Sequence, residues 1–131
     1  MTFRLHLLMC LLWSWPLLHP MLGVGQATDT IFTCQDIFLD SGGSTGNYSS
    51  NARRLLTYCP DGDGFTSVRL HTLELAAGDL IRVFDGADTT AQLLEVLNSQ
   101  DQQLPYIFQA SAQNNSRCLT FQFISDSQDT A

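Results

Sequence analysis

Short apolar runs separated by turn-forming clusters dominate the chain after its first 27 residues. In the clearest run, CLTFQFI at 118–124, apolar and polar side chains alternate, as they do along a strand with one buried face. Turn-forming pairs such as Asp61-Gly62 and Asp85-Gly86 end other runs. We expect strands at 31–34, 37–39, 55–59, 65–75, 80–84, 92–97, 106–109 and 118–124. Many short strands without a long helical period predict an all-β sandwich.

The first 27 residues have a different pattern, which is typical of a secretory signal peptide. Arg4 supplies a positive start, an apolar stretch covers 7–18, and small residues follow near Ala27. The apolar stretch is short for a membrane span of about 20 residues, and Pro16 interrupts it. We therefore predict a signal peptide at 1–27, a single domain at 28–131, no membrane insertion after cleavage, and a secreted or cell-surface location.

The chain has a strongly negative net charge, which limits the classes of binding partner. The chain has 13 acidic residues against six arginines, a net charge of −7. Removal of 1–27 also removes Arg4, so five arginines oppose the same 13 acids and the charge becomes about −8 (5 minus 13). Such a surface repels phosphate backbones, which argues against nucleic acid as a partner. Divalent cations, or basic groups of another protein, fit this charge, and simple solubility is the alternative explanation.

Three cysteines remain in the predicted domain, namely Cys34, Cys59 and Cys118. Export favours disulfides, and a Cys34–Cys59 bridge would close a short loop and stabilise the fold by about 3 kcal/mol. Cys118 then lacks a partner, and the apolar run after it would form an exposed sheet edge close to the end of the chain. We therefore expect a final strand, carrying the cysteine that pairs with Cys118, to lie beyond Ala131.

Acidic residues stand at the ends of three predicted strands. Glu74 closes one strand, Asp79 opens the next, and Asp126 follows the last. Loops at one end of a sandwich are neighbours in space, and converging carboxylates would repel one another unless a hard cation neutralised them. Calcium accepts six to eight oxygen ligands of this kind. The alternative is that such acids only cap turns, which is our interpretation of Asp85.

Four blocks of sequence, in order, resemble a CUB domain, especially the bacterial variety found in large secreted or surface proteins. The blocks are DSGG leading to GNY at 40–48, YCP at 58–60, GDLIRVFDG at 78–86 and CLTFQFISD at 118–126. The resemblance implies a jelly-roll-like antiparallel β-sandwich that mediates extracellular recognition. Many members of the family carry a calcium site at one end, and this site holds a basic side chain of the partner.

The resemblance implies a calcium site at the positions of this sequence that match the family's site residues. Glu74, Asp79 and Asp126 resemble its calcium ligands, with a backbone oxygen near Gln128 as a possible addition. Tyr48 resembles the tyrosine that supports the acidic cluster, so Tyr48, Glu74 and Asp79 are the expected ligand-binding residues. The loop from Glu74 to Asp79 is shorter than in animal relatives and lacks their cysteine. An aromatic residue often precedes the aspartate in the family, whereas this chain has glycine there.

The sequence offers no credible catalytic set. His71 is the one histidine after the predicted signal peptide, and we expect it on the outward face of a strand. Ser41 lacks the strand–elbow–helix context of a hydrolase nucleophile, and the cysteine spacing does not fit zinc. We therefore expect a non-catalytic binding or adhesion module that recognises a basic group on an extracellular protein or glycan-bearing partner. The alternative is a targeting domain of a larger secreted protease or glycosidase whose catalytic part lies beyond Ala131.

Overall fold

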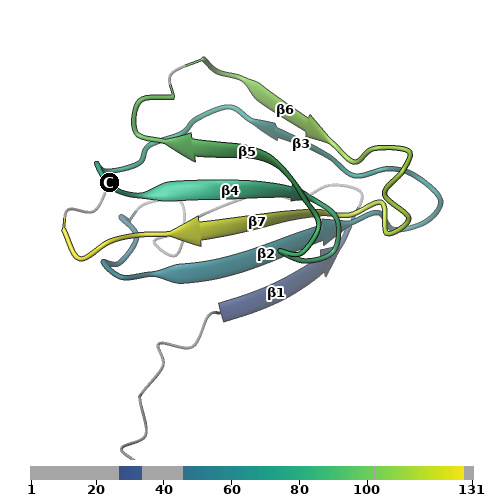
Figure 1. Ribbon diagram of the computed structural model, residues 1–131, viewed down its shortest axis with the longest axis horizontal. Helices are drawn as coiled ribbons and strands as arrows, with labels where there is room; N and C mark the ends of the chain where they lie inside the picture. The colour runs from purple at the N-terminus through teal and green to yellow at the C-terminus, as the bar shows by residue number, and fades with distance from the viewer. Residues whose placement is uncertain (1–26, 34–45, 102, 129–131) are drawn as a thin grey trace, which may run out of the picture.

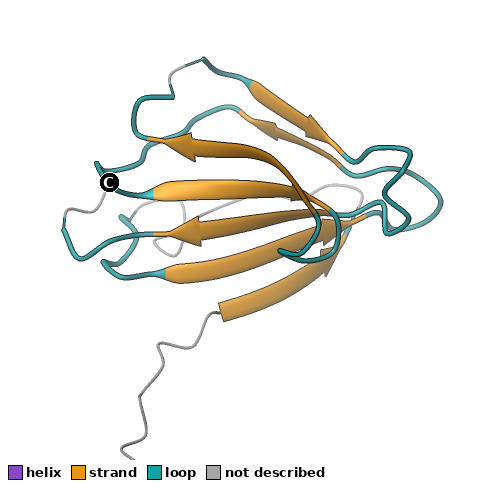
Figure 2. Cartoon of the chain, viewed as in Figure 1, coloured by secondary structure: helices purple, strands orange, loops and turns teal. Residues whose placement is uncertain are grey.

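The computed structural model describes residues 27–33, 46–101 and 103–128, and this part of the chain is all-β (Figure 1). Figure 2 shows strands joined by loops, with no helix among the described residues. The strands are β1 (Ala27–Phe32), β2 (Arg53–Cys59), β3 (Ser67–Leu70), β4 (Leu80–Asp85), β5 (Gln92–Asn98), β6 (Tyr106–Gln109) and β7 (Leu119–Ile124). The described ranges thus contain no helix long and apolar enough to cross a membrane.

The strands form two sheets, which confirms the predicted all-β sandwich. The larger sheet has the order β1-β2-β7-β4-β5, and the smaller one pairs β3 with β6. Every pairing is antiparallel except that of β1 with β2, which is parallel. In Figure 1 the β3–β6 pair lies beyond β5, apart from the ladder that runs from β1 to β5.

The core follows from the alternation along each strand. Leu119, Phe121 and Phe123 of β7 are buried on one face of the larger sheet, as their spacing predicts. Phe108 of the smaller sheet meets Phe121 edge-to-face at a centroid distance of 6.0 Å, so aromatic contact links the two sheets. The core also contains Tyr48, Leu56, Tyr58, Leu70, Ile81, Val83, Leu97 and Ala110.

Two threonines occupy the opposite face of the larger sheet and are also buried. The Thr57 and Thr120 hydroxyls lie 3.0 Å apart, and the Thr120 hydroxyl donates to the Gly86 carbonyl at 2.8 Å. The start of the β4–β5 connection therefore packs over this face (Figure 1). The hydroxyls satisfy each other and the loop, so their burial leaves no polar atom without a partner.

The predicted strands at 55–59, 80–84, 92–97, 106–109 and 118–124 agree with the structure to within two residues at each end. The expected strand at 65–75 is shorter, because β3 covers only Ser67–Leu70. Leu70 pairs with Tyr106, so the next pair would require Pro105, which has no N–H to donate. His71 therefore lies exposed beyond the strand, not within it. The expected strand at 37–39 lies outside the described residues.

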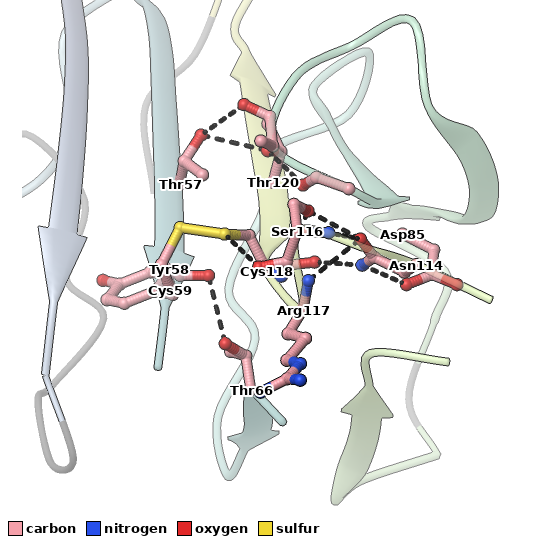
Figure 3. The surroundings of a disulfide bond; sticks show 12 residues. Thr57, Tyr58, Cys59, Thr66, Asp85, Asn114, Ser116, Arg117, Cys118 and Thr120 are labelled. Carbon is pink, nitrogen blue, oxygen red and sulfur yellow. Dashed lines mark hydrogen bonds between the residues drawn. A yellow bond between two sulfur atoms is a disulfide. The ribbon is translucent and has the colours of Figure 1, made fainter. Parts of the chain in front are cut away.

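The structure overturns the predicted cysteine pairing. Cys59 is bonded to Cys118, with an S–S distance of 2.06 Å and a Cα–Cα distance of 4.2 Å (Figure 3). The register explains this bond, because Tyr58 pairs with Leu119 and the next pair outward is Cys59 with Cys118. The predicted Cys34–Cys59 bridge is therefore wrong, as is a partner for Cys118 beyond Ala131. Cys34 itself lies outside the described residues.

The same register corrects the expected position of the last strand. β7 lies in the middle of the larger sheet, with β2 on one side and β4 on the other. Both of its backbone edges are therefore paired without any further strand beside it. The sequence places this strand late in the chain but does not show that two earlier strands flank it.

Candidate functional site

Three loops meet at one end of the sandwich, and we call this end the acidic end. They are the residues that precede β2, the connection from β3 to β4, and the residues that follow β7. The register brings them together, because Arg53 at the start of β2 and Leu80 at the start of β4 both pair with Ile124 at the end of β7. Tyr48, Asp79 and Asp126 lie on these three loops, one on each.

Asp79 is at the centre of the acidic end and only 1% of its surface is exposed. Its Oδ2 accepts a hydrogen bond of 2.6 Å from the Tyr48 hydroxyl, and its Oδ1 accepts one of 2.8 Å from the Asp126 backbone N–H. The Tyr48 hydroxyl in turn accepts from the Ala76 N–H at 2.7 Å. One buried carboxylate therefore holds all three loops, and the predicted support of the acidic cluster by Tyr48 is a direct contact.

Asp126 is half-buried, and its carboxylate lies against the backbone of Gly78. Asp126 Oδ1 accepts from the Gln128 N–H at 2.7 Å, and the Asp126 carbonyl accepts from the Asn51 N–H at 2.6 Å. A Cβ at position 78 would collide with Asp126 Oδ2, and Gly78 has a φ of 94°, which L side chains rarely adopt. The close approach of Asp126 and the positive φ thus explain why position 78 requires glycine.

Ser125 also contributes to the acidic end, although it is not among the residues predicted from the sequence. Its hydroxyl donates to the Ser49 carbonyl at 2.8 Å and accepts from the Ala52 N–H at 2.7 Å. Its own N–H donates to the Ala52 carbonyl at 2.9 Å. Ser125 therefore joins the end of β7 to the loop that carries Tyr48. A serine immediately after an apolar strand is the only sign of this role in the sequence. Its hydrogen-bond partners lie more than 70 residues away along the chain, so no local pattern predicts them.

Glu74 does not join the other predicted ligands. Its side chain is exposed and makes no hydrogen bond or ion pair within the described part of the chain. Across residues 27–33, 46–101 and 103–128, no three His, Cys, Asp or Glu side chains are grouped so that they could hold a metal ion. The structure thus brings Tyr48, Asp79 and Asp126 together and leaves Glu74 apart.

The residues of the acidic end fit a calcium ion in part. Asp79 and Asp126 supply carboxylate oxygens, the donors that calcium prefers, but two carboxylates fall short of its usual six to eight oxygen ligands. No arginine of the described ranges forms an ion pair with either carboxylate. The arginine ion pairs seen in the described ranges, Arg54–Asp29 and Arg117–Asp63, involve other carboxylates. Among residues 27–33, 46–101 and 103–128, no basic side chain therefore neutralises the negative charge of the acidic end.

Asp85 has a different role, at the other end of β4. It accepts hydrogen bonds from the Ser111 N–H at 3.1 Å and from Asn114 Nδ2 at 2.7 Å, and Figure 3 shows Asp85 beside Asn114. Burial acts to raise the pKa of Asp85, but the hydrogen bonds from Ser111 and Asn114 outweigh it and leave the pKa below its ordinary value. Asp85 therefore organises the loop before Cys118, and it is not part of the acidic end.

No protein-family model matches the chain, and no curated protein matches it.

Proposed function

We propose that this chain is an extracellular, non-catalytic binding module of CUB type, and that its acidic end receives a basic group of its partner. The observation that carries this proposal is the buried Asp79 carboxylate, which Tyr48 and the Asp126 N–H hold in place. This network positions Asp126, whose half-buried carboxylate has no basic neighbour among the described residues. A carboxylate that is held in place and has no ion-pair partner among the described residues is what a lysine or arginine of a partner would bind.

Calcium is the second part of the proposal. Asp79 and Asp126 would hold the ion. Glu74, the third ligand that the CUB resemblance implies, would have to move toward them to join, because the structure leaves it apart. When bound, calcium would cancel the repulsion among these carboxylates and so fix the loops that carry them. With calcium bound, the protein as a whole would still carry a net negative charge, because the chain has a charge of −7, and this charge would attract a basic group.

The cysteines support an extracellular location. The Cys59–Cys118 bond is of the kind that persists in oxidising compartments, and export is also what the predicted signal peptide implies. The predicted signal peptide itself lies outside the described residues, apart from Ala27, where β1 begins. Secretion is therefore part of the proposal.

Calorimetry of the secreted protein, in calcium and in chelator, tests the calcium part. We expect calcium to raise the melting temperature of the wild type and of Asp61→Asn, but not that of Asp79→Asn. Asp61 is a matched control because it is exposed and makes no hydrogen bond or ion pair within the described part of the chain. An unchanged melting temperature in the wild type would reject calcium.

Binding to an immobilised lysine-rich peptide tests the charge part separately. We expect Asp126→Ala to weaken this binding by more than Asp61→Ala does, although both substitutions remove one negative charge. Equal losses would show that binding depends only on net charge, and the acidic end would then be rejected as the binding surface.

A further inference from the structure

The larger sheet has a second face, which points away from the core, and we call it the outer face. Paired residues of neighbouring strands lie on the same side of a sheet, so the register places two rows of side chains here. One row is Leu55, Gln122, Arg82 and Val96, and the other is Arg53, Ile124, Leu80 and Asn98. The β4–β5 connection covers a further row, at Thr57 and Thr120, and Figure 1 shows it in front of β7 and β2 at the end away from the acidic end.

The outer face is basic, although the whole chain has a charge of −7. Arg53 and Arg82 are both exposed on it, and neither forms an ion pair with a described residue. The acids of the flanking strands lie on the other side of the sheet, because Asp29 and Glu95 each pair with a core residue of the next strand. Asp126, which follows β7, forms no ion pair with either arginine. Both guanidinium groups can therefore bind an anionic group of a partner.

Aliphatic side chains lie between the two arginines. Leu80 and Ile124 are half-buried, and 37% of the surface of Val96 is exposed. Arg82 donates to Gln122 at 3.5 Å, which leaves most of its N–H donors for a partner. Surfaces that bind other proteins are enriched in arginine and depleted in lysine and acidic residues around an apolar centre. The outer face has this composition, so a protein partner with negative charge fits it.

We propose that the outer face binds an extended acidic segment of a partner protein, whose carboxylates pair with Arg53 and Arg82 and whose apolar side chain lies between them. Strand β7 separates β2 from β4, so the two arginines are about 10 Å apart across the sheet, and the two rows add an offset along it. An extended segment rises about 3.4 Å per residue, so carboxylates four residues apart match this spacing. A guanidinium binds each carboxylate with paired hydrogen bonds. This surface is separate from the acidic end, and its binding does not depend on calcium.

Calorimetric titration of the intact secreted protein tests the proposal. The probe is an extended peptide that has two glutamates four residues apart and a leucine midway between them. Salt at about 0.1 M limits repulsion from more distant acids, because the screening length is then about 10 Å. We expect saturable binding, which Arg53→Gln and Arg82→Gln each weaken by about three- to tenfold. Wild-type protein that shows no saturable binding would overturn the proposal.

Arg69→Gln is the matched control. Arg69 is also exposed and without an ion pair among the described residues, but it lies on β3 of the smaller sheet. The substitution removes the same charge, and we expect it to leave the affinity for the peptide unchanged. Losses equal to that of Arg82→Gln would show that only net charge matters and would contradict a site on the outer face.

Two further measurements test the kind of partner. A peptide with the two glutamates adjacent has the same charge and should bind more weakly; equal affinity would contradict the proposed spacing. Sedimentation of the wild type should show a monomer, and a dimer that Arg82→Gln dissociates would assign the face to a second copy and overturn the proposal. Circular dichroism establishes that each variant is folded. If Arg82→Gln were unfolded, Arg82→Lys would replace it, because lysine keeps the charge but loses the paired hydrogen bonds.

Discussion

At the scale of single residues, Tyr48 is the side chain on which the acidic end depends. Its ring packs edge-to-face on Phe123 in the core, at a centroid distance of 4.8 Å, while its hydroxyl reaches Asp79 and Ala76. The side chain thus connects the hydrophobic core to the polar loops. Its hydroxyl stands between a donor and an acceptor, so removing it takes a hydrogen-bond partner from both the Ala76 N–H and Asp79 Oδ2.

We expect Tyr48→Phe to lower the free energy of unfolding by about 1–3 kcal/mol, because both partners of the hydroxyl are left unpaired. Chemical denaturation measures this change. Tyr106→Phe is the matched control, since the Tyr106 hydroxyl has a 3.5 Å contact with Asp101, and we expect a loss of less than about 0.5 kcal/mol. Equal losses in the two variants would show that the Tyr48 hydroxyl has no special role.

Asp85 makes stability depend on pH in a definite direction. Its pKa is lowered in the folded protein, so its contribution is present above the ordinary value of 3.8 and is lost as the pH falls through the lowered folded value. We expect Asp85→Asn to reduce stability at neutral pH and to flatten the loss of stability at acid pH. Unfolding measured over a series of pH values tests this. An unchanged slope, relative to Asp61→Asn, would contradict it.

Strand-end positions predict that Asp79 and Asp126 lie close together, and the CUB resemblance adds Tyr48; the structure brings these three residues together. The sequence could not predict the hydrogen bonds of Ser125 or the backbone N–H groups that bind Asp79, because these depend on loops that meet only in the folded chain. Glu74 was expected beside Asp79 from its position at a strand end. The strand that should have carried it there ends at Leu70.

At the scale of elements, β7 organises the molecule. It lies between β2 and β4, carries three core residues, begins next to the Cys59–Cys118 bond, and ends at the acidic end. Alternation predicted its limits and its buried face. Its neighbours in the sheet, and therefore the disulfide, depend on pairing between segments about 60 residues apart, which no local pattern encodes.

We expect the loss of the Cys59–Cys118 bond, in the variant Cys59→Ala/Cys118→Ala, to lower the free energy of unfolding by about 4 kcal/mol. The estimate comes from the chain entropy of the loop that the bond closes. Denaturation of the variant and of the wild type gives the difference. Non-reducing digestion of the wild type checks the pairing itself, and a peptide that joins Cys34 to Cys59 would contradict the structure.

At the scale of the whole molecule, the charge of −7 acts over a longer range than any single contact. Exposed charges attract a basic partner less strongly as salt is added, because the screening length falls from about 10 Å at 0.1 M to about 3 Å at 1 M. We therefore expect binding to a lysine-rich peptide to weaken steadily with sodium chloride, mainly through slower association. Surface plasmon resonance measures both rates. Binding that does not change with salt would mean that apolar contacts dominate.

The position of β7 also has a mechanical consequence. A partner that pulls on the loop of Asp126 pulls along β7, which is hydrogen-bonded to strands on both of its sides and covalently tied to β2 near its beginning. Tension applied along β7 acts on its hydrogen bonds to β2 and to β4 at the same time. These hydrogen bonds must therefore break together and not one after another. The acidic end is thus attached to a strand that is paired on both sides and tied by the disulfide, so a force applied at Asp126 would be resisted by both ladders together.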